Sequence, residues 1–321
     1  MKPRSNHAAA RHAGRCLAAV LAAACLAVTT LVPARAHTGK AVIFGHARWP
    51  GVTVKTQVVA DILRDLGYKT RIMTGAQPVM LNGLRRGDID IDMEAWRPSQ
   101  NTLLNKLIKT GHVTQVAANI EAARFGLAVP AYVYKAGVHS LADLHKYPGR
   151  FGRKVYGIAA GDVGNQIIKK AIRNNTYNLH GWRVVPSSTS GMLTQVGKEV
   201  RKKQWIVFLG WAPHWMNVVY NIRYLNDPRH LFGKQSTVYT MANTAFLKSH
   251  PNVARFLRQI RVTLKDQNRW IYRYGYKNVK PGKVARTWIR SHLETVSHWL
   301  DGVTTQSGAR SAIKAVRAQT G

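Results

Sequence analysis

The stretch RGDIDIDMEAWRP, residues 86–98, decides how this chain is expected to fold. Its apolar side chains alternate with four acidic residues over positions 88–94, and a period of two residues predicts a β-strand. The strand is expected to end at Trp96, because Pro98 allows no regular continuation. Four of the 14 acidic residues of the chain lie here, which suits a site for a small organic cation. An exposed edge strand with a packing tryptophan explains the same pattern and stays open.

Strand and helix patterns alternate on both sides of this stretch. Such alternation predicts an α/β fold with parallel strands, whose ligands bind beyond the carboxyl ends of the strands. Trp49 and Trp96 both follow such strand ends. Before the acidic strand we expect strands at 41–45 and 69–73 and helices at 54–66 and 78–84. After it we expect strands at 125–130, 154–158, 182–185, 205–209 and 236–241, and helices at 166–173, 192–203, 252–269, 284–300 and 309–318.

The first 36 residues have the pattern of a secretory signal peptide. A basic start precedes an uncharged run at 17–32, which is short for a membrane span, and Ala34-Arg35-Ala36 is a cleavage pattern. Both cysteines, Cys16 and Cys25, lie in this segment, so we expect a mature chain without disulfides. A mature chain of about 285 residues is long enough to bury a sizeable core.

The chain is strongly basic. It has 48 Lys and Arg against 14 Asp and Glu, and five of the basic residues precede position 37, which leaves a mature net charge of +29. An exported polyanion-binding protein is therefore one alternative function. However, the densest basic runs, 169–170 and 201–203, are short, and there is no zinc-finger or RNP motif. We expect no specific nucleic-acid partner.

Motifs for catalysis or for a metal are missing from the sequence. There is no nucleophile elbow, no phosphate-cradling loop and no compact ligand spacing around His46. We expect no enzyme activity, no cofactor and no metal. An exported hydrolase remains the other alternative.

Five segments carry a resemblance to a known family: 87–96, 125–130, 161–165, 210–215 and 224–228. In this order they resemble the substrate-binding proteins of bacterial ABC importers for quaternary ammonium compounds, the glycine betaine/choline group. The resemblance implies a two-lobed periplasmic binding protein of type II-like fold, with two α/β lobes joined by two crossing strands. Lobe I would comprise residues 37–129 and 240–321, and lobe II residues 130–239.

The resemblance also implies an aromatic box for the ligand. A trimethylammonium group donates no conventional hydrogen bond, so aromatic faces hold it by cation–π attraction. Trp49, Trp96, Phe125 and Trp211 match the aromatic positions of this box. Choline-type members resemble one another in having tyrosine at the position of Phe125. The phenylalanine keeps the ring face and lacks the hydroxyl.

The polar end of the ligand is less determined. Asp162 matches the loop position whose side chain takes the hydroxyl of choline, and its charge would repel the carboxylate of glycine betaine. His214 matches a position that donates to this carboxylate in betaine-type members, so the preferred solute stays open. Gly51 stands where the family has a second polar residue. A helix cap alone explains Asp162 equally well, and this alternative stays open.

The implied function is that of a periplasmic, monomeric, non-enzymatic binding protein. It would close around a quaternary ammonium solute by hinge motion near residues 129–130 and 238–240, and deliver the solute to an ABC permease at the inner membrane.

Overall fold

The structure, a computed structural model, describes residues 40–320. Strands and helices alternate from the beginning of this part of the chain. The first unit has the predicted order, and its first four elements are slightly longer than predicted: β1 (Val42–Ala47), α1 (Pro50–Asp65), β2 (Thr70–Gly75), α2 (Gln77–Arg86) and β3 (Ile91–Arg97). Proline at the first position of α1 fits the helix start. Gly87 ends α2 with φ 84°, a left-handed conformation that glycine adopts without steric cost. The predicted signal peptide, with both cysteines, lies outside the described residues.

Strand β3 lies in the middle of its sheet. It pairs in parallel with β1 and antiparallel with β9 (Ser236–Asn243), and its first six residues are buried. The interpretation as an exposed edge strand is therefore wrong. The strand begins at Ile91, and the side chain of the preceding Asp90 accepts a hydrogen bond from the backbone N–H of Ile43 at 2.7 Å. Both acidic residues inside the strand, Asp92 and Glu94, are buried.

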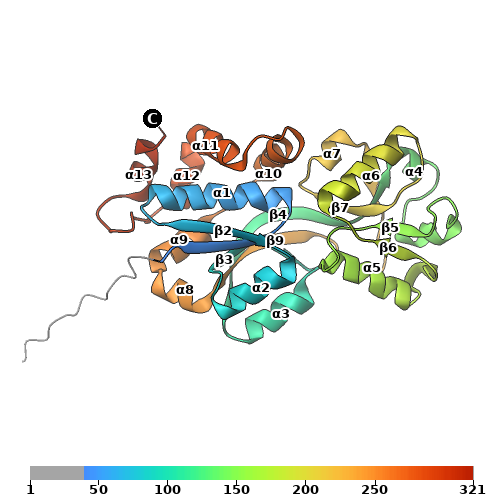
Figure 1. The fold of residues 1–321 in the computed structure, drawn as a ribbon, viewed down its shortest axis with the longest axis horizontal. Coiled ribbons are helices and arrows are strands. Elements are labelled where there is room, and N and C mark those ends of the chain that lie inside the picture. The colour runs from blue at the N-terminus through green and yellow to red at the C-terminus, as the bar shows by residue number, and fades with distance from the viewer. Residues whose placement is uncertain (1–39, 321) are drawn as a thin grey trace, which may run out of the picture. The chain divides into compact units, whose positions relative to one another are not determined.

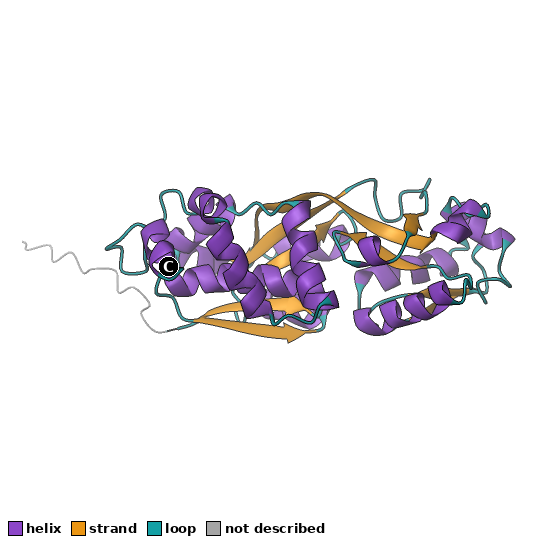
Figure 2. Ribbon diagram, turned by 90° about the horizontal axis from the view of Figure 1, so that it is seen from above, coloured by secondary structure: helices purple, strands orange, loops and turns teal. Residues whose placement is uncertain are grey.

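A long strand that the sequence pattern did not predict, β4 (Val113–Pro130), follows helix α3 (Asn101–Lys109). Only its last part, residues 125–130, was predicted as a strand. Up to Ala123 the strand pairs antiparallel with β9, and from Arg124 on it pairs with β7 (Phe208–Ala212). It therefore passes from one group of strands to the other, and Figure 2 shows long strands running between the two groups of helices.

The second strand group is built around β7. Here β5 (Lys154–Tyr156) pairs in parallel with both β6 (Arg183–Val185) and β7, and β8 (Ile222–Tyr224) pairs with the end of β4. The hydrogen-bonded order of the described strands is β2-β1-β3-β9-β4-β7-β5-β6. The helical elements of this part are α4 (Ala131–Lys135), η1 (Leu141–Lys146), α5 (Val163–Arg173), η2 (Thr176–Asn178), α6 (Thr189–Arg201) and α7 (Met216–Val219).

Helices cover both faces of the strands around β3. In Figure 1, α1 and the C-terminal helices α10 and α11 lie above these strands, and α2, α3 and α8 lie below them. The two long helices predicted at 252–269 and 284–300 are each broken into two, the first because Thr263 caps a new helix through Asp266 N–H. The C-terminal elements are α8 (Thr244–Ser249), α9 (Pro251–Gln259), α10 (Leu264–Ile271), η3 (Tyr272–Tyr276), α11 (Pro281–Ser291), α12 (Leu293–Trp299) and α13 (Ala312–Ala318).

Three tryptophans of the C-terminal helices form part of the core. The ring of Trp288 meets that of Trp270 edge-on at 4.9 Å between centroids and stacks on Trp299 at 5.3 Å. All three are buried, as expected for packing residues. Within residues 40–320, no helix combines the length and the apolar character that a membrane crossing requires.

Candidate functional site

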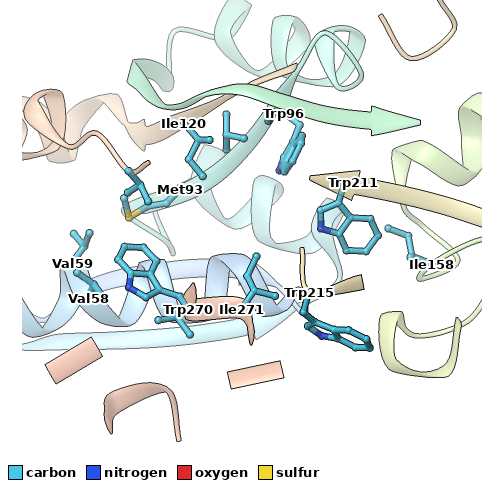
Figure 3. Close-up of a cluster of buried hydrophobic side chains, with 14 of the residues drawn as sticks. Val58, Val59, Met93, Trp96, Ile120, Ile158, Trp211, Trp215, Trp270 and Ile271 are labelled. Atoms are coloured by element: carbon cyan, nitrogen blue, oxygen red, sulfur yellow. The ribbon is translucent and has the colours of Figure 1, made fainter. Parts of the chain in front are cut away.

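A cavity lined from several parts of the fold collects most of the predicted site residues. The residues that line it are Trp49, Glu94, Trp96, Ser99, Gln100, Phe125, Ile158, Asp162, Val163, Gly164 and Trp211. Five of the six predicted residues are among them, and His214 is not. Figure 3 shows Trp96, Trp211 and Ile158 beside one another, approaching from different strands and loops.

The four aromatic residues reach the cavity from three places in the fold. Trp49 directly precedes α1, and Trp96 lies near the end of β3. Phe125 and Trp211 are cross-strand partners of β4 and β7. The rings of Trp96 and Phe125 lie 6.1 Å apart between centroids at 50°. Trp96 and Trp211 are buried, and the other two are half-buried, so the rings present their surfaces to a largely desolvated space.

Glycine is required at position 164 by the ring of Phe125. A Cβ atom there would lie 2.7 Å from Cζ of Phe125, a distance that real Cβ contacts do not adopt. Because Gly164 lies in the first turn of α5, its lack of a side chain lets the ring approach the start of this helix. The second neighbour of Phe125 is the buried Phe232, whose ring meets it edge-on at 5.5 Å. Phe125 is therefore held between two fixed surfaces.

Trp96 is held in place by hydrogen bonds at both its backbone and its indole. Its backbone N–H donates to Gln100 Oε1 at 3.0 Å, and its indole Nε1–H donates to Glu94 Oε1 at 3.3 Å. Glu94 in turn forms an ion pair with Lys55, with 2.6 Å between Oε2 and Nζ, and Lys55 also donates to Asn119 Oδ1 at 2.8 Å. Lys55 is completely inaccessible to solvent. The indole is thus anchored to a buried polar network that extends from β3 into α1 and β4.

Asp162 faces the cavity and caps a helix at the same time. Its Oδ1 accepts a hydrogen bond from the backbone N–H of Gly164 at 2.7 Å, which is the capping geometry at the start of α5. The side chain is buried, and this desolvation raises the pKa of its carboxyl to about 7. Asp162 therefore caps the helix and lines the cavity at the same time, so the two interpretations of this residue are compatible.

His214 lies beside the cavity wall without lining it. It is completely buried against Trp211 and Trp215, with ring centroids 4.9 and 5.3 Å away, and its Nδ1 accepts from the backbone N–H of Met216 at 3.1 Å. Burial lowers the pKa of His214 to about 3, so the ring is neutral at physiological pH. A neutral ring behind Trp211 supports the indole rather than facing the enclosed space.

The departure at Gly51 has a packing explanation. A Cβ atom on Gly51 would lie 2.6 Å from Nε2 of Gln267, a buried residue of α10. The amide of Gln267 therefore occupies the space that a side chain at position 51 would need. Neither residue lines the cavity.

Six lining residues were not predicted from the sequence as site residues. Glu94 could have been predicted from the sequence, because it stands two positions before Trp96 in an alternating strand and so points to the same face. Val163 and Gly164 adjoin Asp162 in the sequence. Ser99, Gln100 and Ile158 follow strand ends, and only the fold brings them to one cavity. Within residues 40–320, no cluster of three His, Cys, Asp or Glu side chains suits a metal ion.

The sequence and the fold match proteins of one kind. Residues 40–291 match the family described as the substrate binding domain of ABC-type glycine betaine transport systems. The structure of an ABC-transporter choline binding protein in complex with choline is 30% identical, with a TM-score of 0.85 over 88% of this chain and 98% of that chain. Lactococcal OpuAC, in its closed-liganded conformation complexed with glycine betaine, is 26% identical, with a TM-score of 0.74 over 81% and 99%. An uncharacterized protein, ORF1 of Chromohalobacter salexigens, is 37% identical over 144 residues, which are 44% of this chain and 93% of that protein.

Proposed function

The chain belongs to the substrate-binding domains of ABC-type glycine betaine transport systems, and we propose that it holds choline or glycine betaine in its aromatic cavity. One observation carries the proposal. Four aromatic side chains, those of Trp49, Trp96, Phe125 and Trp211, meet in one cavity together with the carboxyl of Asp162. Aromatic faces and a negative group are the features that attract a cation lacking hydrogen-bond donors.

The energy available from such a cavity suits a solute-binding protein. Each ring face contributes about 0.5–2 kcal/mol to cation binding when water is excluded. Four rings with their apolar contacts therefore approach the roughly 8 kcal/mol that corresponds to micromolar affinity. Trp96 and Trp211 supply most of this attraction, because both are buried and both are held by neighbouring side chains or strands.

Binding is proposed to close the two lobes by a hinge at the crossing strands. The partner change of β4, from β9 at Ala123 to β7 at Arg124, supports a first crossing at this point, some residues before the expected boundary at 129. Phe125 would then move with Trp211 and Asp162, and Trp49 and Trp96 would form the opposite wall.

The proposed protein acts as a monomer in the periplasm after removal of its signal peptide. It hands its solute to an inner-membrane permease and performs no chemistry on it. Members of this family work in transport with a permease, which supports this assignment over the exported hydrolase. In this proposal, the basic surface of the protein binds no specific nucleic acid.

Calorimetric titration of the mature protein with choline and with glycine betaine tests the proposal directly. Trp96→Ala and Trp211→Ala are each expected to weaken binding by about 2 kcal/mol, or roughly thirtyfold, without unfolding the protein. The matched control is Trp205→Ala. Trp205 packs against Tyr147 and Phe151, away from the cavity, so its loss should leave affinity unchanged. Near-normal affinity in both cavity variants would refute the aromatic site.

A further inference from the structure

Of the two carboxyl oxygens of Asp162, one accepts a hydrogen bond and the other does not. Oδ1 is held by the N–H of Gly164, which fixes the carboxyl at the start of α5. Oδ2 has no hydrogen-bond partner among the described residues, although the side chain as a whole is only 5% exposed. A carboxylate oxygen without a partner, on a side chain that is fixed at a cavity wall, is suited to a hydrogen bond with a ligand.

Among residues 40–320, no positive charge compensates the carboxyl of Asp162. The other titratable group at the cavity is Glu94 of β3, and its charge is matched by Lys55 of α1 at 2.6 Å. From β4 and β7, the groups facing the cavity are the uncharged rings of Phe125 and Trp211. Within residues 40–320 no ion pair involves Asp162. Burial without a counter-charge places the pKa of its carboxyl at about 7, so both protonation states are populated near neutral pH.

We propose that the protonation state of Asp162 decides which solute the cavity prefers, with the ionised carboxylate selecting choline and the protonated carboxyl selecting glycine betaine. This inference rests on the proposed function and adds a rule of selectivity to it. The ionised group attracts the cation of choline and accepts a hydrogen bond from its hydroxyl. The protonated group donates a hydrogen bond to the carboxylate of glycine betaine, which the ionised group would repel.

The proton balance of the two ligands has opposite signs. Choline favours the ionised carboxylate, so its binding releases a proton from the fraction of protein that is protonated. Glycine betaine favours the protonated form, so its binding takes up a proton from solvent. In the limit where each ligand binds one form only, the ratio of choline affinity to betaine affinity rises by about tenfold per pH unit.

The experiment measures both affinities by calorimetry on the mature protein at pH 6, 7 and 8. Titrations in two buffers of different ionisation enthalpy give the number of protons released or taken up. In the wild type we expect the choline-to-betaine affinity ratio to rise by at least tenfold across this range, with proton release for choline and uptake for betaine. Asp162→Asn keeps the capping acceptor for Gly164 and cannot ionise, so its ratio should stay constant.

A second carboxyl with a pKa near 7 provides the matched control. Burial raises the pKa of Asp92 to about 7, but its Oδ1 accepts from Glu94 N–H and the residue does not line the cavity. Asp92→Asn should therefore retain the pH-dependent ratio. A constant ratio in the wild type, or a rising ratio in Asp162→Asn, would overturn the inference while both ligands still bind. If neither ligand binds at any pH, the proposed function itself fails.

Discussion

Replacing Lys55 with methionine would break the buried ion pair that anchors the cavity wall. The ammonium group of Lys55 is fully inaccessible, lies 2.6 Å from Glu94 Oε2 and also donates to Asn119 Oδ1 at 2.8 Å. Methionine fills a similar volume but leaves the carboxylate of Glu94 without its counter-charge. Removing one partner of a buried pair typically costs about 3–5 kcal/mol. We expect the free energy of unfolding to fall by this amount, a large part of the total stability of a domain.

Urea unfolding followed by tryptophan fluorescence measures this loss. In the double variant Lys55→Met/Glu94→Gln, both charges are absent, and glutamine still offers an oxygen to the indole of Trp96. Because replacing both charges of a buried pair is often neutral, the double variant should recover at least half of the lost stability. Lys69→Met, at an exposed lysine before β2, controls for loss of a lysine and should change stability by less than about 0.5 kcal/mol. A Lys55→Met loss below about 1 kcal/mol, or a double variant no more stable than the single one, would refute the reasoning.

Two further predictions concern pH and salt. Burial raises the pKa of Asp92 to about 7, so the folded state favours the protonated carboxyl. The stability contributed by this group is fully present below about pH 4. As the pH rises from about 4 to 7, the free energy of unfolding falls by up to about 1.4 kcal/mol per pH unit. Urea unfolding at several pH values should show a smaller fall for Asp92→Asn than for the wild type, and identical slopes would contradict the assignment. Choline affinity should change by less than about threefold between about 0.05 and 0.2 M salt, whereas the affinity of a polyanion-binding protein for its polyanion would fall by about a thousandfold or more. Absence of choline binding, together with binding of an added polyanion that weakens this steeply with salt, would favour the polyanion alternative.

Local patterns in the sequence were sufficient for most of the first unit. The alternation before Trp96 and the helical spacing after Trp49 correspond to β3 and α1 as the structure has them. The same patterns predicted only residues 125–130 of the long strand β4, because its pairing changes from β9 to β7 and its burial follows no simple period. The exposed-edge interpretation of β3 failed for a related reason. Its alternating acids suggest a solvated face, but Asp92 and Glu94 are buried. Asp92 accepts a hydrogen bond from the backbone N–H of Glu94, and Glu94 pairs with Lys55 of α1.

The cavity divides in the same way between sequence and tertiary structure. The sequence indicated the family through the resemblance of five segments, and this resemblance also pointed to five of the residues that line the cavity. Only the tertiary structure decided that Lys55 pairs with Glu94, that Gln267 fills the space beside Gly51, and that His214 lies outside the cavity. The first two contacts join residues that are far apart in the chain. The position of His214 depends on the direction in which its ring points after the end of β7. Their energies depend on burial, and burial is a property of the assembled fold.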